Sequence, residues 1–276
     1  MSGEMKLDNR TAVVTGAASG IGRAIAISLA RRGCHLALAD LNEAGLAETR
    51  ERAVSEGIRI SLHRLDVADR EAIASFPATV MSEHGRVDLL VNDAGVAVGG
   101  TFDQVSETDF DWLLAINFWG VVRMTRAFLP YLRASDDARI VNLSSLYGLI
   151  SPPGQTAYCA SKFAVRGFTQ SLGNELEGSF IGVTVVHPGG VATSIARNAR
   201  LPKGLGEEEA RQRLAAVEKV LRLPPETAGE IIVRAIERRK RRVLVGKDAK
   251  LMSVIERLLP VSHWKVLRWL SQRARR

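Results

Sequence analysis

The segment VVTGAASGIGRA, residues 13–24, leads from a short apolar run into a helical pattern through a turn that contains three glycines. Gly16, Gly20 and Gly22 follow the spacing G-x3-G-x-G. Glycines in such a turn permit a tight bend and a close backbone approach to a ligand, and the helix behind it directs amide groups toward an anion such as pyrophosphate. Many strand-to-helix turns also contain glycine for structural reasons alone. The segment therefore predicts a strand, a turn and a helix, with dinucleotide binding as one of two interpretations.

The rest of the chain repeats this alternation of short apolar runs and helix-length segments. The seven apolar runs span residues 11–16, 35–40, 60–67, 87–95, 138–145, 182–189 and 241–246. Strands that are apolar on both faces and alternate with helices indicate a parallel sheet that is covered on both sides. We therefore expect the fold class α/β, with a doubly wound, seven-stranded parallel sheet and helices on both faces.

Two stretches interrupt the alternation and set the expected domain organisation. Residues 190–228 contain one helical pattern, 207–222, between loops with glycine and proline. An insertion just after the end of a strand is where such folds place a mobile substrate lid. The chain also continues past its last strand. We therefore expect a single domain over residues 1–248, with the lid inside it, and a basic amphipathic extension over residues 249–276.

The composition is that of an ordinary globular protein. Of the 276 residues, 46% are hydrophobic and 25% are charged, which suffices for a sizeable core. No apolar stretch reaches the roughly 18 residues of a membrane span, and the polar start MSGEMKLDNR does not have the pattern of a signal peptide. Cys34 and Cys159 are far apart and form no metal or redox motif. We expect a cytoplasmic protein without a disulfide or a metal site.

The net charge of +8 is concentrated at one end of the chain. Residues 234–276 contain 14 Lys/Arg and 3 Asp/Glu, a surplus of +11, so that the first 233 residues carry a net charge of −3. A nucleic-acid enzyme would carry basic residues near its chemistry as well. This distribution argues against nucleic acid as a partner.

Polar residues stand where three of the predicted strands end. Asp40 ends the second strand, and a carboxylate there can accept hydrogen bonds from ribose hydroxyls and repel a 2′-phosphate. Asp66 ends the third strand, where an adenine ring would lie, and Asn92 ends the fourth. Ligands of open α/β sheets bind at the carboxyl ends of the strands. These positions favour the dinucleotide interpretation of the glycine-rich turn.

A second group of polar residues follows the fifth strand. Ser145 closes that strand, and Tyr158 and Lys162 lie at the start of the next helical pattern. Residues four apart share a helix face, and a nearby cation lowers the pKa of a phenol. A serine beside a tyrosine can hold a substrate oxygen while the tyrosine gives or takes its proton. Tyr-x3-Lys also occurs as an ordinary helical pair, but the serine and the strand-end residues favour a proton-transfer site.

These motifs resemble those of the short-chain dehydrogenase/reductase family over residues 8–246. The resemblance implies a Rossmann-type fold and reversible hydride transfer between a nicotinamide cofactor and an alcohol or ketone. The matching positions are Thr15-Gly16-Ala17-Ala18-Ser19-Gly20-Ile21-Gly22, Asp66-Val67, Asn92-Asp93-Ala94-Gly95, Asn117, Ser145, Tyr158-Cys159-Ala160-Ser161-Lys162, Pro188-Gly189 and Thr193.

The resemblance also implies roles for individual residues. Tyr158 would be the acid/base, Ser145 the donor to the substrate oxygen, and Lys162 a ligand of the nicotinamide ribose that also lowers the tyrosine pKa. Asn117 would hold a water that passes protons on from Lys162. Together with Asp40, Tyr158 and Lys162, the expected cofactor-binding residues are Gly16, Ser19, Gly20, Ile21, Gly22, Asp66, Val67, Asn92, Ala94, Gly95, Pro188, Gly189, Val191 and Thr193.

Two positions depart from the family pattern. Asp93 stands where a second asparagine is usual. Because that position commonly ties neighbouring strands together, we expect a modest structural change there. His187 precedes Pro188-Gly189 where asparagine is frequent, and we assign it no catalytic role.

We expect an oxidoreductase that acts on the CH–OH group of a secondary alcohol, with Asp40 favouring NAD over NADP. A hydrophobic substrate such as a steroid, long-chain or terpenoid alcohol would suit the apolar lid residues. These are Ile195, Leu201, Leu205, Leu214, Val217, Val220 and Leu221. Two alternatives stay open: an NADP-dependent carbonyl reductase, and a nucleotide-binding regulatory protein without turnover.

Two surfaces suggest partners. The first is a flat face of small residues on the Tyr158 helix, and the resemblance implies a homodimer or homotetramer through it. Its residues are Ala157, Ser161, Ala164, Gly167 and Ser171. The second is an apolar stripe in the extension, with arginines and lysines around it. That stripe fits three interpretations: packing on the protein itself or on a subunit, peripheral contact with an anionic membrane surface, or another partner.

Overall fold

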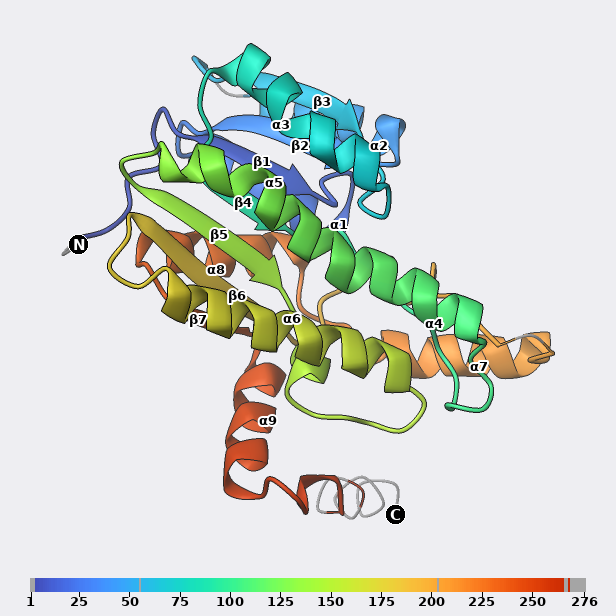
Figure 1. Cartoon of the computed structure of the whole chain (residues 1–276). Coiled ribbons are helices and arrows are strands. Elements are labelled where there is room, and N and C mark those ends of the chain that lie inside the picture. The colour runs from blue at the N-terminus through green and yellow to red at the C-terminus, as the bar shows by residue number, and fades with distance from the viewer. Residues whose placement is uncertain (1–2, 55, 203, 266–267, 269–276) are drawn as a thin grey trace.

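A seven-stranded parallel sheet forms the centre of the molecule (Figure 1). The computed structural model describes residues 3–54, 56–202, 204–265 and 268. The strands are β1 (Thr11–Thr15), β2 (His35–Asp40), β3 (Ile60–Arg64), β4 (Leu89–Asn92), β5 (Ala138–Leu143), β6 (Ile181–Pro188) and β7 (Arg242–Val245). Their order, β3-β2-β1-β4-β5-β6-β7, reverses direction between β1 and β4. The predicted fold class is confirmed, and the reversal marks the switch point where such sheets bind ligands.

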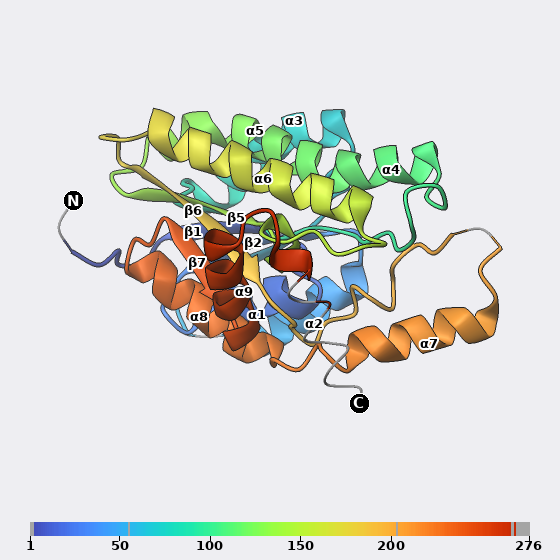
Figure 2. The ribbon, with the colours of Figure 1, turned by 90° about the horizontal axis from the view of Figure 1, so that it is seen from below.

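Helices cover both faces of this sheet (Figure 2). They are α1 (Gly20–Ala30), α2 (Glu43–Ala53), α3 (Arg70–His84), α4 (Glu107–Leu114), α5 (Val121–Arg133), α6 (Thr156–Glu175), α7 (Glu207–Glu218), α8 (Pro225–Glu237) and α9 (Lys247–Leu258). Helices α1, α2 and α8 pack on one face, and α3, α5 and α6 pack on the other. The sheet is thus the middle of three layers.

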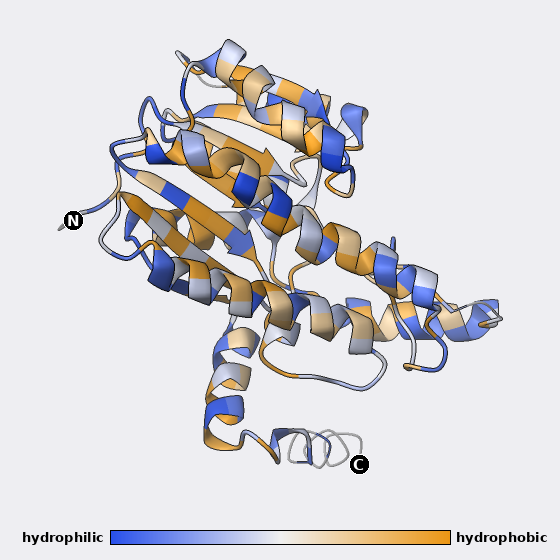
Figure 3. Ribbon diagram, viewed as in Figure 1, coloured by the Kyte–Doolittle hydropathy of each residue, from blue (hydrophilic) through white to orange (hydrophobic). Residues whose placement is uncertain are grey.

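The core lies between these layers, as two apolar clusters on opposite faces of the sheet. Ile25 and Ile232 belong to the cluster beneath α1 and α8, and Phe76 and Phe128 belong to the cluster beneath α3 and α5. Every residue of β1 is buried, and the strands are largely hydrophobic in Figure 3. Burial on both faces explains why the strands appear in the sequence as continuous apolar runs.

Side-chain caps fix where three of the helices begin. Asn42, Asp69 and Ser106 each accept a hydrogen bond from the backbone amide three residues further on. Such a cap satisfies an amide that has no partner within the helix. Helix α3 ends at Gly85, which has a φ of 75°, a conformation that glycine adopts readily. The caps thus define the first residues of α2, α3 and α4.

The long helix expected over residues 106–132 is present but changes its pitch in the middle. Helix α4 leads into a π-helical segment, η1 (Ala115–Gly120), and then into α5. In this segment the backbone pairing shifts from i+4 to i+5, a feature often found at functional sites. Asn117 lies inside it and is fully buried. A π-helical segment has no characteristic pattern of apolar residues, so the sequence did not predict it.

The lid region and the C-terminal helix stand apart from the sheet (Figures 1 and 2). Helix α7 projects outward, and none of its residues is buried. In α9 the side chains of Leu251 and Leu258 are 56% and 72% exposed. The expected apolar positions Leu267, Trp269 and Leu270, and the basic positions Arg273, Arg275 and Arg276, lie outside the described residues. No helix in the described ranges is long and apolar enough to cross a membrane.

A buried carboxylate joins the segments that precede three central strands. Asp88 comes directly before β4, and its side chain is fully buried. It accepts hydrogen bonds from the Thr11 amide (2.9 Å), the Ser135 hydroxyl (2.6 Å), and the guanidinium groups of Arg10 (3.0 Å) and Arg86 (2.6 Å). Burial raises the pKa of Asp88, but the hydrogen bonds outweigh it, so that the pKa lies below its ordinary value.

We predict that Asp88→Ala lowers the free energy of unfolding by about 3 kcal/mol, because it leaves buried donors without an acceptor. Because the folded pKa of Asp88 is depressed, its contribution is complete above the ordinary carboxyl pKa of about 4. This contribution to the free energy of unfolding is lost as the pH falls through the pKa that Asp88 has in the folded state. Urea denaturation at several pH values measures both effects, with the exposed Asp111→Ala as the control. Equal stability of the two variants at neutral pH would contradict the assignment.

Candidate active site

The glycine-rich turn packs directly against the segment that follows β4. A Cβ atom on Gly22 would lie 2.3 Å from the Gly16 carbonyl oxygen, and one on Gly16 would lie 2.8 Å from the Ala94 amide nitrogen. Gly16 and Gly20 also have positive φ angles of 69° and 55°, which favour glycine. The turn therefore needs glycine for close packing, and this packing brings the N-terminus of α1 to the edge of the sheet.

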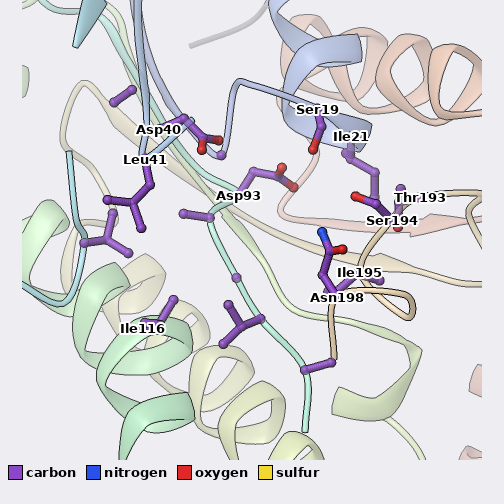
Figure 4. Close-up of a pocket in the computed structure, with 18 of the residues that line it drawn as sticks. Ser19, Ile21, Asp40, Leu41, Asp93, Ile116, Thr193, Ser194, Ile195 and Asn198 are labelled. Atoms are coloured by element: carbon purple, nitrogen blue, oxygen red, sulfur yellow. The ribbon is translucent and has the colours of Figure 1, made fainter. Parts of the chain in front are cut away.

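A cavity lies at the carboxyl ends of β1, β2 and β4, beneath the lid (Figure 4). Ten of the predicted cofactor-binding residues line it: Gly16, Ser19, Gly20, Ile21, Asp40, Asp66, Val67, Ala94, Gly95 and Thr193. The other predicted residues are not part of its lining, namely Gly22, Asn92, Asn117, Ser145, Tyr158, Lys162, Pro188, Gly189 and Val191. Leu41, Asp93, Ile195 and Asn198 line it without having been predicted as cofactor ligands.

The catalytic candidates border this cavity at one end. A Cβ atom on Gly95 would lie 3.2 Å from the Asn117 side-chain oxygen and 3.5 Å from the Lys162 ammonium nitrogen. Gly95 therefore separates the cavity from Asn117 and Lys162 by a single backbone segment. The predicted cofactor-binding residues and the predicted catalytic residues therefore meet at this glycine.

The two strand-end carboxylates are held by backbone amides. Asp40 accepts hydrogen bonds from the amides of Ala18 (3.1 Å) and Asn42 (3.0 Å). Asp66 accepts one from the Ala68 amide (2.8 Å). Each carboxylate oxygen has more than one acceptor site, so that both groups can still receive donors from a ligand in the cavity.

Two asparagines organise the surrounding backbone with their side chains. The Asn92 amide group donates to Asn142 on β5 (2.8 Å) and thereby ties β4 to β5. Asn117 accepts from the Val96 amide (2.8 Å), and its own amide group donates to the Val96 carbonyl (2.9 Å). It also donates to the Ser161 hydroxyl (3.2 Å). The side chain of Asn117 is therefore engaged in fixing the segment after Gly95 against α6.

Ser145, Tyr158 and Lys162 come together as their spacing predicted, although Lys162 is directed differently. The Ser145 hydroxyl accepts from the Tyr147 amide (3.1 Å) and is hydrogen-bonded to the Tyr158 phenol. The Lys162 ammonium lies 5.7 Å from the centre of the Tyr158 ring. It donates to the Leu143 carbonyl at 3.1 Å. The ammonium thus faces the aromatic ring of Tyr158, at a distance typical of a cation–π contact.

Burial dominates the electrostatics of this pair. It raises the pKa of Tyr158 to about 12, against the opposing hydrogen bond from Ser145. It lowers the pKa of Lys162 to about 8, against the opposing charge of Asp93. In the free chain, desolvation of the phenolate is the largest effect on the pKa of Tyr158. The expectation that Lys162 lowers this pKa stays a prediction.

Sequence reasoning missed the position of Asp93. Asn92, and not Asp93, ties neighbouring strands together. The Asp93 carboxyl points into the cavity, toward the turn that carries Ser19 and Ile21 (Figure 4). Burial raises its pKa to about 7, while Lys162 and the Gly22 amide act in the opposite direction. The departure from the family pattern was visible in the sequence, but the direction of the side chain was not.

His187 was also given no role, and the structure places it directly behind Ser145. It is fully buried, and its Nδ1 lies 3.0 Å from the Ser145 backbone oxygen. Because a carbonyl only accepts, Nδ1 carries the proton, and the buried Nε2 has no hydrogen-bond partner among the residues that the structure describes. Burial lowers the pKa of His187 to about 4. The neutral imidazole therefore supports the backbone at the end of β5 without adding a charge.

Residues 190–228, which we expect to form a lid, begin at the cavity and contact α9. A Cβ atom on Gly20 would lie 3.1 Å from the Thr193 methyl group, so that the start of the lid covers the glycine-rich turn. The Gly190 amide donates to Asp248 in the first turn of α9 (2.6 Å). Val191 forms a β-bridge with Leu223 at the far end of the region. Both ends of the lid are thus fixed, whereas α7 between them is exposed.

The chain matches known proteins over most of its length. The family model described as short chain dehydrogenase covers residues 10–204. The chain therefore belongs to the short-chain dehydrogenase family, and it is an oxidoreductase of a family that binds NAD(P). It is similar to "Putative oxidoreductase SadH" of Mycobacterium tuberculosis, at 41% identity over 263 residues. The match covers 94% of this chain and 94% of that protein.

Solved structures of the same family include complexes with both nicotinamide dinucleotides. A short-chain dehydrogenase/reductase from Burkholderia phymatum in complex with NAD matches at 30% identity and a TM-score of 0.83, over 91% of this chain and 93% of that one. A metagenomic short-chain oxidoreductase in complex with NADP matches at 36% identity and a TM-score of 0.64, over 68% and 85%. The choice between the two cofactors therefore depends on residues of this chain.

Proposed function

We propose that this chain catalyses reversible hydride transfer between NAD(H) and the CH–OH group of a secondary alcohol or the corresponding ketone. One observation carries the proposal: Ser145, Tyr158 and Lys162 converge beside a cavity that is lined by the glycine-rich turn and Asp40. A regulatory protein without turnover has no chemical need for a buried lysine, a serine and a tyrosine in this arrangement. The intact trio therefore favours an enzyme.

The cavity residues fit a dinucleotide. The glycine-rich turn has no room for a Cβ atom at Gly16 or Gly22, and it presents the N-terminus of α1 to a pyrophosphate. Asp40 would hold the adenine ribose, and Asp66 and Val67 would lie against the adenine. Ala94 and Gly95 would form the middle of the site, and Asn92, Pro188 and Gly189, which are outside the cavity lining, would support it. Val191 and Thr193 would contact the carboxamide, and Lys162 the second ribose.

A bound nicotinamide supplies the hydride acceptor or donor. In the oxidation direction, Ser145 holds the substrate oxygen while Tyr158 takes the hydroxyl proton as the carbon gives up its hydride. In the reduction direction, Tyr158 returns that proton to the carbonyl oxygen. Lys162 stabilises the negative charge that develops on the phenol. Because the Asn117 side chain is engaged with Val96, we assign the proton-relay water to its backbone carbonyl in the π-helical segment.

Asp40 supports NAD over NADP, because its carboxylate would meet the 2′-phosphate of NADP with like charge. Two arginines on elements next to Asp40 are paired with glutamates. Arg23 forms a salt bridge with Glu48, and Arg64 lies 3.5 Å from Glu43. Leu41 lines the cavity next to Asp40 and offers no cation.

The substrate we propose is hydrophobic, of a steroid, long-chain or terpenoid type. Ile195 lines the cavity. Leu201, Val217 and Val220 in the lid region are 44%, 41% and 63% exposed. Large exposed apolar side chains around a site mark it as one that contacts apolar ligands or partners. They would cover an apolar substrate when the lid moves onto it.

We further propose a homodimer or homotetramer through α5 and α6. Trp119 in η1, directly before α5, and Phe163 in α6 are 48% and 36% exposed, and Phe118 in η1 contacts Phe168 in α6. A Cβ atom on Gly167 would meet nothing within 4 Å. An exposed aromatic face with a flat glycine position suits close packing of a second copy.

The C-terminal extension would hold this cytoplasmic enzyme at the surface of an anionic membrane. Three of its apolar residues, Leu251, Val254 and Leu258, are more than half exposed, whereas Ile255 and Trp264 are half-buried. Lys250, Arg257 and other basic residues lie around this stripe. Apolar stripes with basic flanks bind anionic lipid surfaces. Contact with a partner subunit is the second candidate for the same stripe.

We predict that Tyr158→Phe reduces kcat by about 10²–10⁴-fold, because only the ionisable hydroxyl is lost. The dissociation constant for NAD should stay within about twofold, since the ring and Lys162 remain. NADH formation across a panel of secondary alcohols measures the first effect, and fluorescence titration measures the second. Tyr147→Phe is the matched control, because its ring contacts Tyr158 edge-on but has no assigned role. Wild-type turnover by the Tyr158 variant would refute the assignment.

We predict that kcat/KM is higher with NAD than with NADP. Two unit charges 4 Å apart repel by about 4 kcal/mol at an effective dielectric constant near 20. A quarter of that energy gives a preference of about fivefold. Asp40→Ala should narrow the preference, and an additional Leu41→Arg should move it further toward NADP, whereas Leu41→Gln should not. Equal values for both cofactors in the wild-type protein would mean that Asp40 does not face the ribose.

We predict that the full chain floats with liposomes that contain anionic lipid and that removal of residues 249–276 abolishes flotation. Liposomes without anionic lipid should bind less, because the basic flanks lose their partner. The double variant Leu251→Ser, Leu258→Ser keeps the chain length and should weaken flotation. Light scattering measures the assembly in parallel. A smaller assembly for the truncated chain, without flotation of the full chain, would assign the stripe to a subunit contact instead.

A further inference from the structure

The Asp93 carboxyl lies between the glycine-rich turn and the catalytic lysine. One of its oxygens is 2.7 Å from the point where a Cβ atom on Gly22 would stand, and it accepts a hydrogen bond from the Gly22 amide. Figure 4 shows the side chain directed into the cavity, between Asp40 and the turn that carries Ser19 and Ile21. The group thus lies at the N-terminus of α1, on the floor of the cavity.

Charged and titratable groups reach Asp93 from three neighbouring elements. From α6, the positive charge of Lys162 stabilises the carboxylate. The negative charge of the carboxylate in turn raises the pKa of the Tyr158 phenol. From the end of β2, the carboxylate of Asp40 repels it. The first turn of α1 contributes the Gly22 amide. The backbone amides of Asp93 and Ala94 both donate to the Thr15 hydroxyl, at 3.2 Å each, so that this segment is fixed to β1.

We propose that Asp93 is a proton-linked determinant of cofactor affinity: its carboxyl takes up one proton from solvent when the pyrophosphate of a dinucleotide binds at the N-terminus of α1. This inference rests on the dinucleotide function proposed for the cavity. Pyrophosphate and an ionised Asp93 are like charges that share one helix N-terminus and one region of low dielectric. A protonated Asp93 removes that repulsion and keeps its remaining oxygen as an acceptor for the Gly22 amide.

The ionisation of free Asp93 lies in the range where this linkage can be measured. Burial raises its pKa to about 7, and a bound pyrophosphate would raise it further. Below pH 7 the carboxyl is already protonated, so that binding needs no proton. Above pH 7 the free chain must take up a proton in order to bind, so that affinity falls by at most about tenfold for each pH unit. The dissociation constant should therefore rise with pH until the carboxyl of the complex also ionises.

The first test is isothermal titration calorimetry of the full chain with NAD, in buffers of different ionisation enthalpy. Wild-type protein at about pH 7.5 should take up about half a proton or more per chain. Its dissociation constant should rise about fivefold to twentyfold between about pH 6.5 and about pH 8.5. Asp93→Asn keeps the shape and the acceptor oxygen, and it should lose both the greater part of the uptake and the greater part of the pH dependence. Lys162 titrates in both proteins, and loss of the Asp93 charge also shifts its pKa, so that the spectroscopic test below assigns the proton to the carboxyl.

Asp111→Asn is the matched control, since the same change at an exposed position of α4 should leave the wild-type uptake unchanged. The second test needs no variant and therefore does not depend on its folding. Infrared difference spectra of the NAD complex minus the free chain at about pH 8 should show a new carboxylic acid C=O band that shifts in D2O. Asp93→Asn should lack that band.

The outcomes separate this inference from the proposed function. Tight NAD binding with the same proton uptake in wild type and Asp93→Asn, or without an acid band in the wild-type spectrum, would overturn the role of Asp93 and leave the dehydrogenase function intact. Failure of the wild-type chain to bind either NAD or NADP at any pH would instead overturn the function of the cavity, and this inference with it.

Discussion

The contact between the glycine-rich turn and the segment after β4 is the constraint on which the site depends. A side chain at Gly16 or Gly22 would overlap backbone atoms of Ala94 or of the turn itself. Without that close approach, the N-terminus of α1 would stand away from the sheet, and the cavity would lose its floor. The same contact fixes Gly95, behind which Asn117 and Lys162 lie. One tight turn thus sets the distance between the cofactor cavity and the catalytic candidates.

The sequence predicts the parts of the fold that follow from burial. Strands buried on both faces must be apolar throughout, and all seven were found at the predicted places. The predicted ends were less accurate. The apolar run 87–95 contains a strand of only four residues, Leu89–Asn92, because the chain leaves the sheet at Asp93 to form the cavity. A pattern of apolar residues does not distinguish a strand from a buried segment that follows it.

The parts that the sequence did not predict depend on how residues from distant elements face one another. The direction of Asp93 is set by the glycine-rich turn and by α6, and the contact of His187 with Ser145 is set by the pairing of β5 with β6. The π-helical segment around Asn117 has no periodicity of its own. The predicted effect of Lys162 on Tyr158 considered only the spacing of the pair, whereas burial of both groups decides their pKa values.

Burial has opposite consequences for the two titratable groups of the catalytic pair. It favours the neutral phenol of Tyr158 and the neutral amine of Lys162, whereas alcohol oxidation needs a tyrosine that accepts a proton and a lysine that stays charged. In the free chain, ionised Asp93 helps to keep Lys162 charged, but its negative charge also raises the pKa of Tyr158. Protonation of Asp93 on cofactor binding, as proposed above, would remove both effects. Burial in the free chain therefore favours the neutral phenol. An oxidised nicotinamide bound as proposed would add a positive charge beside Tyr158 and lower the cost of its ionisation. In the proposed reaction, this charge would couple proton abstraction by Tyr158 to the presence of the oxidised cofactor.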